Sequence, residues 1–315
     1  METEKSIIEI KGKIEELKER SENGNVGLSS EIIDYENKLR DLIISLQFGL
    51  SPWEIVQLSR NPKRPVLQDY IELIFKNFVE LRGDRYFSDD RAIIGGFAEI
   101  SDQKVMLIGH NKGKNTVENV ERNFGMGKPE GYRKALRLMK LAERYNVPII
   151  TLIDTPGAFP GIEAEERGQA EAIARNLTEM ASIEVPIISV VIGEGGSGGA
   201  LGIGVGDKVL MLSNAIYSVI SPEGCASILW RDAKYAPDAA VALNLTASSL
   251  LNLNVIDEII KEPAEGAHLH YRTTANAVKK SIIKNIKALK GLSVDELIQS
   301  RFKKYSGIGI FSYAD

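Results

Sequence analysis

The sequence of 315 residues contains one cysteine, three histidines and few aromatic side chains (7%). The single cysteine, Cys225, excludes an internal disulfide and a cysteine-rich zinc site, and it fits a reducing compartment. No stretch is dense in lysine and arginine, and 39 basic against 43 acidic residues leave a formal net charge of −4, so nothing marks the chain for nucleic acid. The longest apolar runs, such as 185–192, are too short to cross a bilayer, and the N-terminus lacks the apolar segment of a signal peptide. These absences predict a cytoplasmic protein that binds neither a membrane nor nucleic acid.

The first fifty residues differ in texture from the rest of the chain. Apolar residues recur there at spacings of three and four on both sides of a turn-like stretch at 21–25, which predicts a helical hairpin. Its narrow apolar stripes suit packing either on its own domain or on a partner chain. The connector Asn61-Pro62-Lys63-Arg64-Pro65 disfavours helix, so we predict a boundary near residue 60.

Beyond this connector the pattern alternates between strands and helices. The expected strands are 93–100, 104–108, 147–153, 185–192, 208–212 and 216–220. The expected helices are 69–81, 129–145, 163–182, 198–206, 275–290 and 294–303. Such alternation predicts an α/β fold whose sheet has parallel strand pairs linked by right-handed crossovers, and 43% hydrophobic residues supply its core.

A run of eight glycines within residues 193–206 lies between an expected buried strand and a helix. Glycine tolerates positive φ and lets a ligand touch the backbone, and the first N–H groups of a helix have no partners within it. The positive end of the helix dipole lies at the same place. This loop is therefore expected to bind negative charge.

The glycine loop matches two known patterns. Gly193-x-Gly195-x-x-Gly198 has the dinucleotide spacing, but the next strand ends in Ser213-Asn214 rather than in the acid that holds a ribose hydroxyl. Gly195-x-Ser197-x-Gly199 matches the nucleophile elbow, with Ser197 as the nucleophile. The acids and histidines that could complete a triad lie downstream, and we expect both histidines in an exposed loop. They are Asp232, Asp238, Asp257, His268 and His270. A serine hydrolase using Ser197 stays open as the alternative function.

A second loop, Asp154-Thr155-Pro156-Gly157-Ala158-Phe159-Pro160-Gly161, follows the preceding buried strand. Loops at the carboxyl ends of neighbouring parallel strands line one crevice, so we expect the two loops to share a site. Two prolines and two glycines around Phe159 make a stiff wall with an apolar face, suited to a flat, uncharged ring. We expect Asp154, which precedes Thr-Pro, to organise the turn.

Several segments together resemble the alpha subunits of bacterial acetyl-CoA carboxylase carboxyltransferase, members of the crotonase superfamily. The segments are 83–85, 122–126, 129–139, 154–161, 164–169, 193–200, 218–226 and 266–268. The resemblance runs from about residue 52 to 270. Phe159 departs from it, since many relatives have tyrosine there, and this concerns fine contacts of the pocket.

The resemblance implies a crotonase-like spiral of ββα units, to which the apolar spacing adds an N-terminal helical hairpin and a helical C-terminal extension. Residues 1–60 would form the hairpin and linker, 61–270 the carboxyltransferase domain and 271–315 the extension. The implied enzyme moves the carboxyl group of carboxybiotin to acetyl-CoA, which forms malonyl-CoA in the first committed step of fatty-acid synthesis.

The resemblance also implies partners. Biotin is carried on a biotin carrier protein and is not covalently bound to this chain, which holds no metal. Activity requires a beta subunit, expected in an α2β2 heterotetramer, and biotin carboxylase belongs to the wider complex.

Site residues follow from the resemblance as well. The backbone N–H groups of Gly198, Gly199 and Ala200 would be the oxyanion donors, which stabilise charge on the biotin ureido oxygen without reorganising. Gly195 and Gly196 would shape the loop. The wall of the biotin pocket would be formed by Gly157, Ala158, Phe159, Pro160 and Gly161. The biotin anion itself would serve as the base for the acetyl methyl group.

Overall fold

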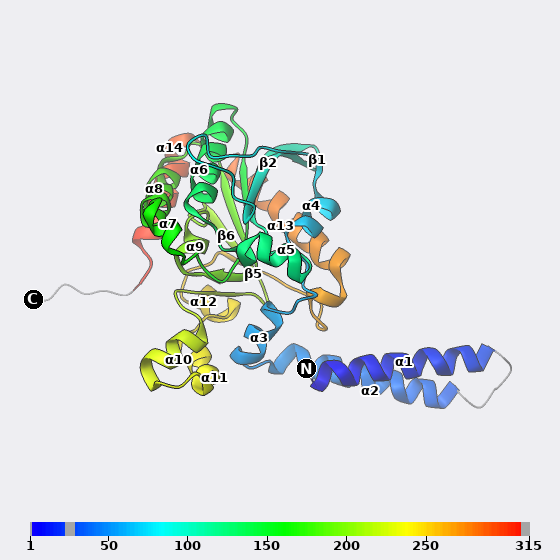
Figure 1. The fold of residues 1–315 in the computed structure, drawn as a ribbon. Coiled ribbons are helices and arrows are strands. Elements are labelled where there is room, and N and C mark those ends of the chain that lie inside the picture. The colour runs from blue at the N-terminus through cyan, green and yellow to red at the C-terminus, as the bar shows by residue number, and fades with distance from the viewer. Residues whose placement is uncertain (1, 23–28, 310–315) are drawn as a thin grey trace, which may run out of the picture. The chain divides into compact units, whose positions relative to one another are not determined.

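The computed structural model describes residues 2–22 and 29–309 (Figure 1). Its internal contacts divide the chain into two units, Met1–Ser51 with Pro263–Gly266 and Pro52–Glu262 with Ala267–Asp315. The division precedes the proline connector because Val56 of α3 (Pro52–Ser59) is buried in a cluster with Ile216 and Leu245 of the larger unit.

The smaller unit contains the helical hairpin that the sequence predicts. Its helices α1 (Glu2–Glu22) and α2 (Ser29–Gly49) pack on each other, and Ile7, Ile14 and Leu17 of α1 are buried. The hairpin is confirmed, whereas the predicted turn falls partly on residues 23–28, which lie outside the described residues.

One sheet forms the centre of the larger unit. Over the described residues its strand order is β1-β2-β3-β4-β5-β6-β8, and β7 pairs with β5. The strands are β1 (Lys76–Glu80), β2 (Ile93–Ile100), β3 (Gln103–His110), β4 (Ile149–Thr155), β5 (Ile187–Gly196), β6 (Lys208–Leu212), β7 (Ile216–Ser218) and β8 (Glu258–Ile260). The first three pair antiparallel, and β3, β4, β5, β6 and β8 are parallel neighbours. This confirms the predicted α/β class with parallel strand pairs.

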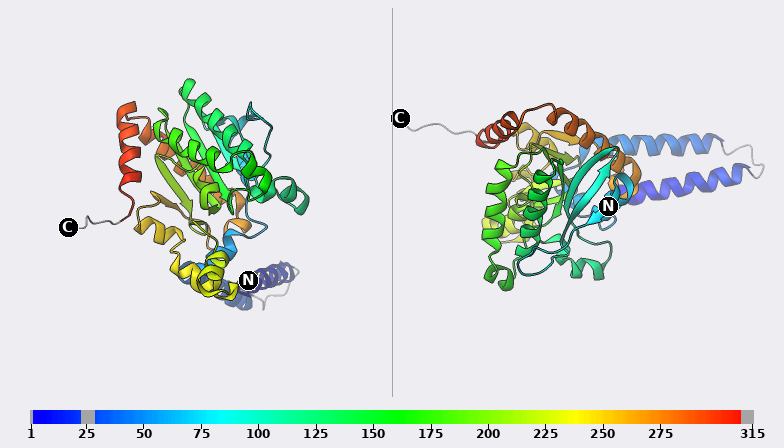
Figure 2. Two further views of the ribbon diagram at one scale, coloured as in Figure 1. Left: turned by 60° about the vertical axis from the view of Figure 1, so that its left-hand side comes forward. Right: turned by 90° about the horizontal axis from the view of Figure 1, so that it is seen from above.

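Helices cover both faces of the sheet (Figures 1 and 2). The remaining helices are α4 (Leu67–Ile74), α5 (Thr116–Glu121), α6 (Pro129–Arg144), α7 (Ile162–Glu166), α8 (Gln169–Ser182), α9 (Ser197–Leu201), α10 (Pro222–Trp230), α11 (Ala236–Ala242), α12 (Ala247–Asn252), α13 (Tyr271–Leu289) and α14 (Val294–Ser306). Short 3₁₀ turns lie at η2 (Asn123–Gly125), η3 (Ala233–Tyr235) and η4 (Ala267–Leu269). Helix α6 packs on β2, β3 and α8, whereas α13 packs on α4, β5 and β8. The strand β4 between them is buried along its whole length, as its apolar run predicts.

Three expected helices are wrong in detail, and one strand was missed. The helix expected over 69–81 ends at Ile74, because Asn77 adopts φ +51° and residues 76–80 pair with β2 as an edge strand. Gly168, at φ +82°, divides the helix expected over 163–182. The helix expected over 198–206 ends at Leu201, and β8 was not expected at all.

Candidate functional site

The glycine loop and the second loop meet backbone to backbone. A Cβ added to Gly199 would lie 2.3 Å from the carbonyl carbon of Gly157 and 2.5 Å from the amide nitrogen of Ala158. A Cβ added to Gly196 would lie 2.1 Å from the carbonyl oxygen of Pro156. The absence of side chains at Gly196 and Gly199 therefore lets the two loops touch, as expected of loops that share one site.

Strand β5 runs through the first glycines, and α9 begins directly after it at Ser197. Gly196 is the N-cap of α9, and no side chain caps this end. The N–H groups in the first turn of a helix have no acceptor within it, and in α9 these are the N–H groups of Ser197, Gly198 and Gly199. The end of α9 thus offers backbone donors beside the second loop.

Two buried side chains lie against the carbonyl side of Gly199. The Tyr132 hydroxyl of α6 donates a hydrogen bond to the Gly199 carbonyl oxygen at 3.3 Å, and Asn176 donates to the carbonyls of Tyr132 and Gly202. His110, at the end of β3, is fully buried, and this burial lowers its pKa to about 3 although the Gly199 backbone opposes the shift. The ring is therefore neutral near pH 7, and His110 and Tyr132 both lie next to the backbone of Gly199.

A buried charge network joins the carboxyl ends of β3, β4 and β5. The Lys112 ammonium lies 2.8 Å from a carboxylate oxygen of Asp154 and 2.8 Å from one of Glu194. Asp154 also accepts the backbone N–H of Glu194 at 2.9 Å, and the Arg60 guanidinium pairs with Glu194 at 2.7 Å. Each loop therefore begins at a carboxylate that is held by the same lysine.

The charges in this network are mutually stabilised. Burial alone raises the pKa of Glu194, but Lys112 and Arg60 outweigh it and hold that pKa below its ordinary value. Burial lowers the pKa of Lys112, and the two carboxylates reverse the direction and raise it. Glu194 and Lys112 are thus both ionised near neutral pH.

A cavity of about 620 Å³ opens beside this network. It is lined by Ser59, Arg60, Asn61, Pro62, Arg64, Val66, Lys112, Gly113, Lys114, Asn115, Thr116, Asn119, Phe124, Met126, Asp154, Pro156 and Glu194. The loop residues 157–161 and 198–200 do not line it, so the cavity borders the first residues of the two loops.

The second loop is held in place by contacts of Phe159 with neighbouring residues. Phe159 donates its N–H to the Gly127 carbonyl at 3.0 Å, its carbonyl accepts the Gln169 amide at 3.0 Å, and the Lys128 ammonium lies 4.7 Å from the centre of its ring. A Cβ added to Gly161 would lie 2.3 Å from the Phe159 ring. The ring is therefore half-buried in a defined position.

Two of the acids proposed for a hydrolytic triad, Asp232 and Asp257, have other partners. Ser197 has φ +48°, the strained backbone of a strand-to-helix elbow. Asp232 caps η3 and pairs with Lys234, and Asp257 accepts the Val209 N–H and pairs with Lys304. Asp238 lies exposed in the first turn of α11. His268 is buried in η4 and His270 is half-buried, so the expectation of an exposed loop is wrong for His268.

Sequence analysis missed His110, Tyr132, Arg60 and the network role of Lys112. The sequence did contain a signal for Lys112. It follows the carboxyl end of β3, just as Asp154 and Glu194 lie at the carboxyl ends of β4 and β5. Among the described residues no cluster of three or more histidine, cysteine or acidic side chains could hold a metal ion. Within the same residues no helix has the length and apolarity to span a membrane.

Solved structures with this fold include carboxyltransferases. A transcarboxylase 12S core is similar with a TM-score of 0.55 and 19% identity, over 76% of this chain and 44% of that one. A Pseudomonas malonate decarboxylase hetero-tetramer gives 0.55 and 14% identity, over 69% of this chain and 87% of its own. The fold class is thus the crotonase-like fold of these enzymes, which confirms the expected class.

Sequence comparison identifies the family within that class. Residues 1–309 match the family described as acetyl co-enzyme A carboxylase carboxyltransferase-like, and the chain belongs to it. Its relatives include acetyl-coenzyme A carboxylase carboxyl transferase alpha subunits from three bacteria. These are the proteins of Chlorobium phaeovibrioides (54% identical, 98% of this chain and 96% of the relative), Geobacter metallireducens (54%, 99% and 98%) and Bacillus cytotoxicus (53%, 100% and 97%).

Proposed function

We propose that the chain is the alpha subunit of an acetyl-CoA carboxylase carboxyltransferase. It transfers the carboxyl group of carboxybiotin to acetyl-CoA and so forms malonyl-CoA for fatty-acid synthesis. The observation that carries this function is the family match over residues 1–309, together with relatives more than half identical along their whole length. The relatives give no support to hydrolysis at Ser197, although its backbone has the positive φ of an elbow.

The backbone of the glycine loop performs the electrostatic part of the reaction in this proposal. The N–H groups of Gly198, Gly199 and Ala200 donate to the ureido oxygen. Negative charge develops on this oxygen as the carboxyl group leaves. Carboxybiotin supplies the carboxyl group. After the carboxyl group has left, biotin also supplies a base for the acetyl methyl group. Preset donors need no reorganisation in the transition state, and each is worth on the order of 3 kcal/mol.

The second loop would hold the biotin ring. Residues 157–161 pack against the glycine loop at Gly199, and the half-buried Phe159 presents an aromatic face beside them. Asp154, Glu194 and Lys112 tie the starts of both loops together, so donors and wall keep a fixed spacing.

Membership of the family implies biotin and a beta subunit. The proposal further includes where biotin is attached, the metal content, the location of the enzyme and the stoichiometry. Biotin is attached to a carrier protein rather than to this chain, no metal is needed in this chain, and the enzyme works in the cytoplasm. The alpha and beta chains form an α2β2 assembly that cooperates with biotin carboxylase.

Reconstitution tests this function. The purified chain alone should not exchange carboxyl groups between malonyl-CoA and biocytin, and addition of the beta chain should restore the exchange, because this chain supplies one half of the site. Full activity of the isolated chain, or none with the beta chain, would refute the proposal.

A further inference from the structure

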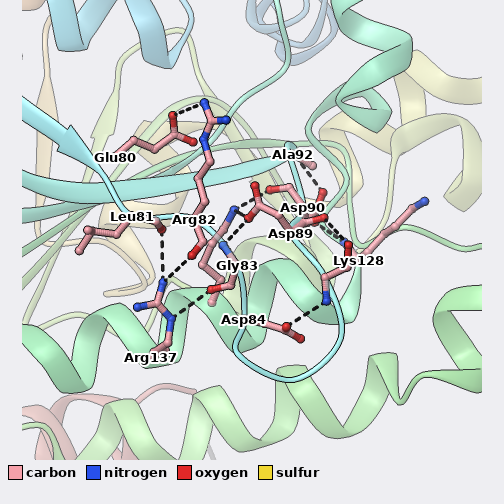
Figure 3. A network of polar contacts seen from close by, with 12 residues as sticks. Glu80, Leu81, Arg82, Gly83, Asp84, Asp89, Asp90, Ala92, Lys128 and Arg137 are labelled. Atoms are coloured by element: carbon pink, nitrogen blue, oxygen red, sulfur yellow. Dashed lines mark hydrogen bonds and ion pairs between the residues drawn. The ribbon is translucent and has the colours of Figure 1, made fainter.

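The segment between β1 and β2, residues 82–90, is held by a dense set of polar contacts (Figure 3). One carboxylate oxygen of Asp84 accepts the backbone N–H groups of Tyr86, Phe87 and Ser88 at 2.8–3.1 Å. Asp89 accepts the Gly83 N–H at 2.8 Å. We call this segment the aspartate loop, and its own carboxylates fix its backbone.

Three cationic residues of α6 fasten the aspartate loop to the body. The Arg133 guanidinium pairs with Asp84 at 2.9 Å, and the fully buried Lys134 ammonium binds Asp89 and the Asp90 carbonyl. Arg137 donates to the carbonyls of Leu81, Arg82 and Gly83 (Figure 3). The backbone of this surface loop is thereby tied to α6 at several points.

The aspartate loop exposes two aromatic side chains among charged and polar ones, which are Arg82, Arg85, Ser88 and Asp89. The side chains of Tyr86 and Phe87 are 86% and 64% exposed. The Arg133 guanidinium lies 5.2 Å from the centre of the Tyr86 ring and that of Arg167 5.0 Å from the Phe87 ring. Two aromatic rings held on a rigid backbone and left in water are typical of a protein-binding surface, because little conformational freedom is lost on contact.

Contacts connect this surface to the wall of the proposed biotin site. Asp90 accepts the N–H of Lys128, whose ammonium lies over the Phe159 ring. Arg167, whose guanidinium lies over the Phe87 ring, is the C-cap residue of α7. Helix α7 begins at Ile162, which is 77% exposed and directly follows the wall residue Gly161. The aspartate loop and the biotin wall thus share neighbours at Lys128 and along α7.

We propose that Tyr86, Phe87 and Ile162 form the docking surface for the biotin carrier protein. This inference rests on the proposed function, since it names the surface that receives the macromolecular substrate. A biotin tethered to a protein reaches the wall only if the carrier comes to rest within the length of its biotinyl-lysine arm. The two aromatic rings and Ile162 lie close to that wall, where a docked carrier domain would bring its biotinyl lysine within reach of it.

The test compares tethered with free biotin in the reconstituted alpha-beta complex. The double variant Tyr86→Ser, Phe87→Ser should raise KM for biotinylated carrier protein about tenfold or more, as expected when two central aromatic contacts are removed. Its kcat and KM for free biocytin should stay within twofold, because the loop backbone is held by Asp84 and α6 rather than by these rings. The matched control is Phe302→Ser on α14, an aromatic side chain 72% exposed, which should leave both substrates unaffected.

Three results would overturn the docking surface. They are an unchanged KM for the carrier, equal losses with carrier and biocytin, and weakened binding of the beta chain, which would assign the rings to that partner. A wild-type complex inactive with both substrates would instead refute the proposed function.

Discussion

A single methyl group at Gly199 is expected to disable the site, whereas the same group at Gly198 is not. The Cβ of Gly199→Ala would lie 2.3 to 2.7 Å from three backbone atoms of Gly157 and Ala158, none of which can turn aside like a side chain. The Cβ of Gly198→Ala would meet only the Ile173 side chain, at 3.7 and 3.8 Å, which is ordinary contact. The two variants therefore differ in whether the loops must separate.

Separating the loops displaces the donor nearest the wall. Loss of one oxyanion donor costs about 3 kcal/mol, or roughly a hundredfold in kcat. Gly199→Val, with a β-branched side chain at the same place, should be at least as severe. Gly198→Ala keeps its N–H, and we expect its kcat to stay within about threefold of the wild type, since a methyl group facing Ile173 leaves the donor in place.

The assay is kcat for carboxyl exchange between malonyl-CoA and biocytin by the reconstituted complex, with circular dichroism to verify folding. A Gly199→Ala complex that keeps wild-type kcat would refute the reasoning. So would a Gly198→Ala complex as impaired as the Gly199 variant, because contact with the wall would then not explain the effect.

Two further predictions concern the buried network. Lys112→Met leaves the carboxylates of Asp154 and Glu194 without their shared cation, and breaking a buried pair should lower the free energy of unfolding by about 3 kcal/mol or more in urea titrations; a loss near zero would contradict the network. The folded-state pKa of Glu194 lies below its ordinary value of 4.5, so its stabilisation is complete above that value and is lost as pH falls through the folded-state pKa. The difference in unfolding free energy between wild type and Glu194→Gln should therefore be constant from pH 8 to about 5.5 and shrink below 4.5, and a difference that grows in acid would contradict this sign.

The sequence predicted those features whose cause is local. The dense glycines between a buried strand and a helix predicted that a helix starts there, as α9 does. They were expected to let a ligand touch the backbone, whereas the structure shows the second loop in close contact at Gly199. Loops at the carboxyl ends of neighbouring parallel strands lie at the same edge of a sheet. This rule was sufficient to predict that the two loops lie next to each other.

Features set by distant contacts could not be predicted in this way. The pattern over residues 76–80 is compatible with a helix, and only pairing with β2 makes it a strand. Arg60 reaches Glu194 across 134 positions of the chain, and Tyr132 reaches Gly199 across 67. Of the aspartate loop, the sequence singled out only Gly83-Asp84-Arg85. The position of its exposed rings depends on the α6 side chains beneath them, which are distant in the sequence.

The kcat of a Ser197→Ala complex is the measurement that bears most directly on the central claim that backbone donors, not a side-chain nucleophile, perform the catalysis. Removing a hydroxyl that takes no part in bond formation should leave carboxyl exchange within about tenfold of the wild type. A fall of about ten-thousandfold or more in a correctly folded complex, as loss of a nucleophile produces, would contradict the account.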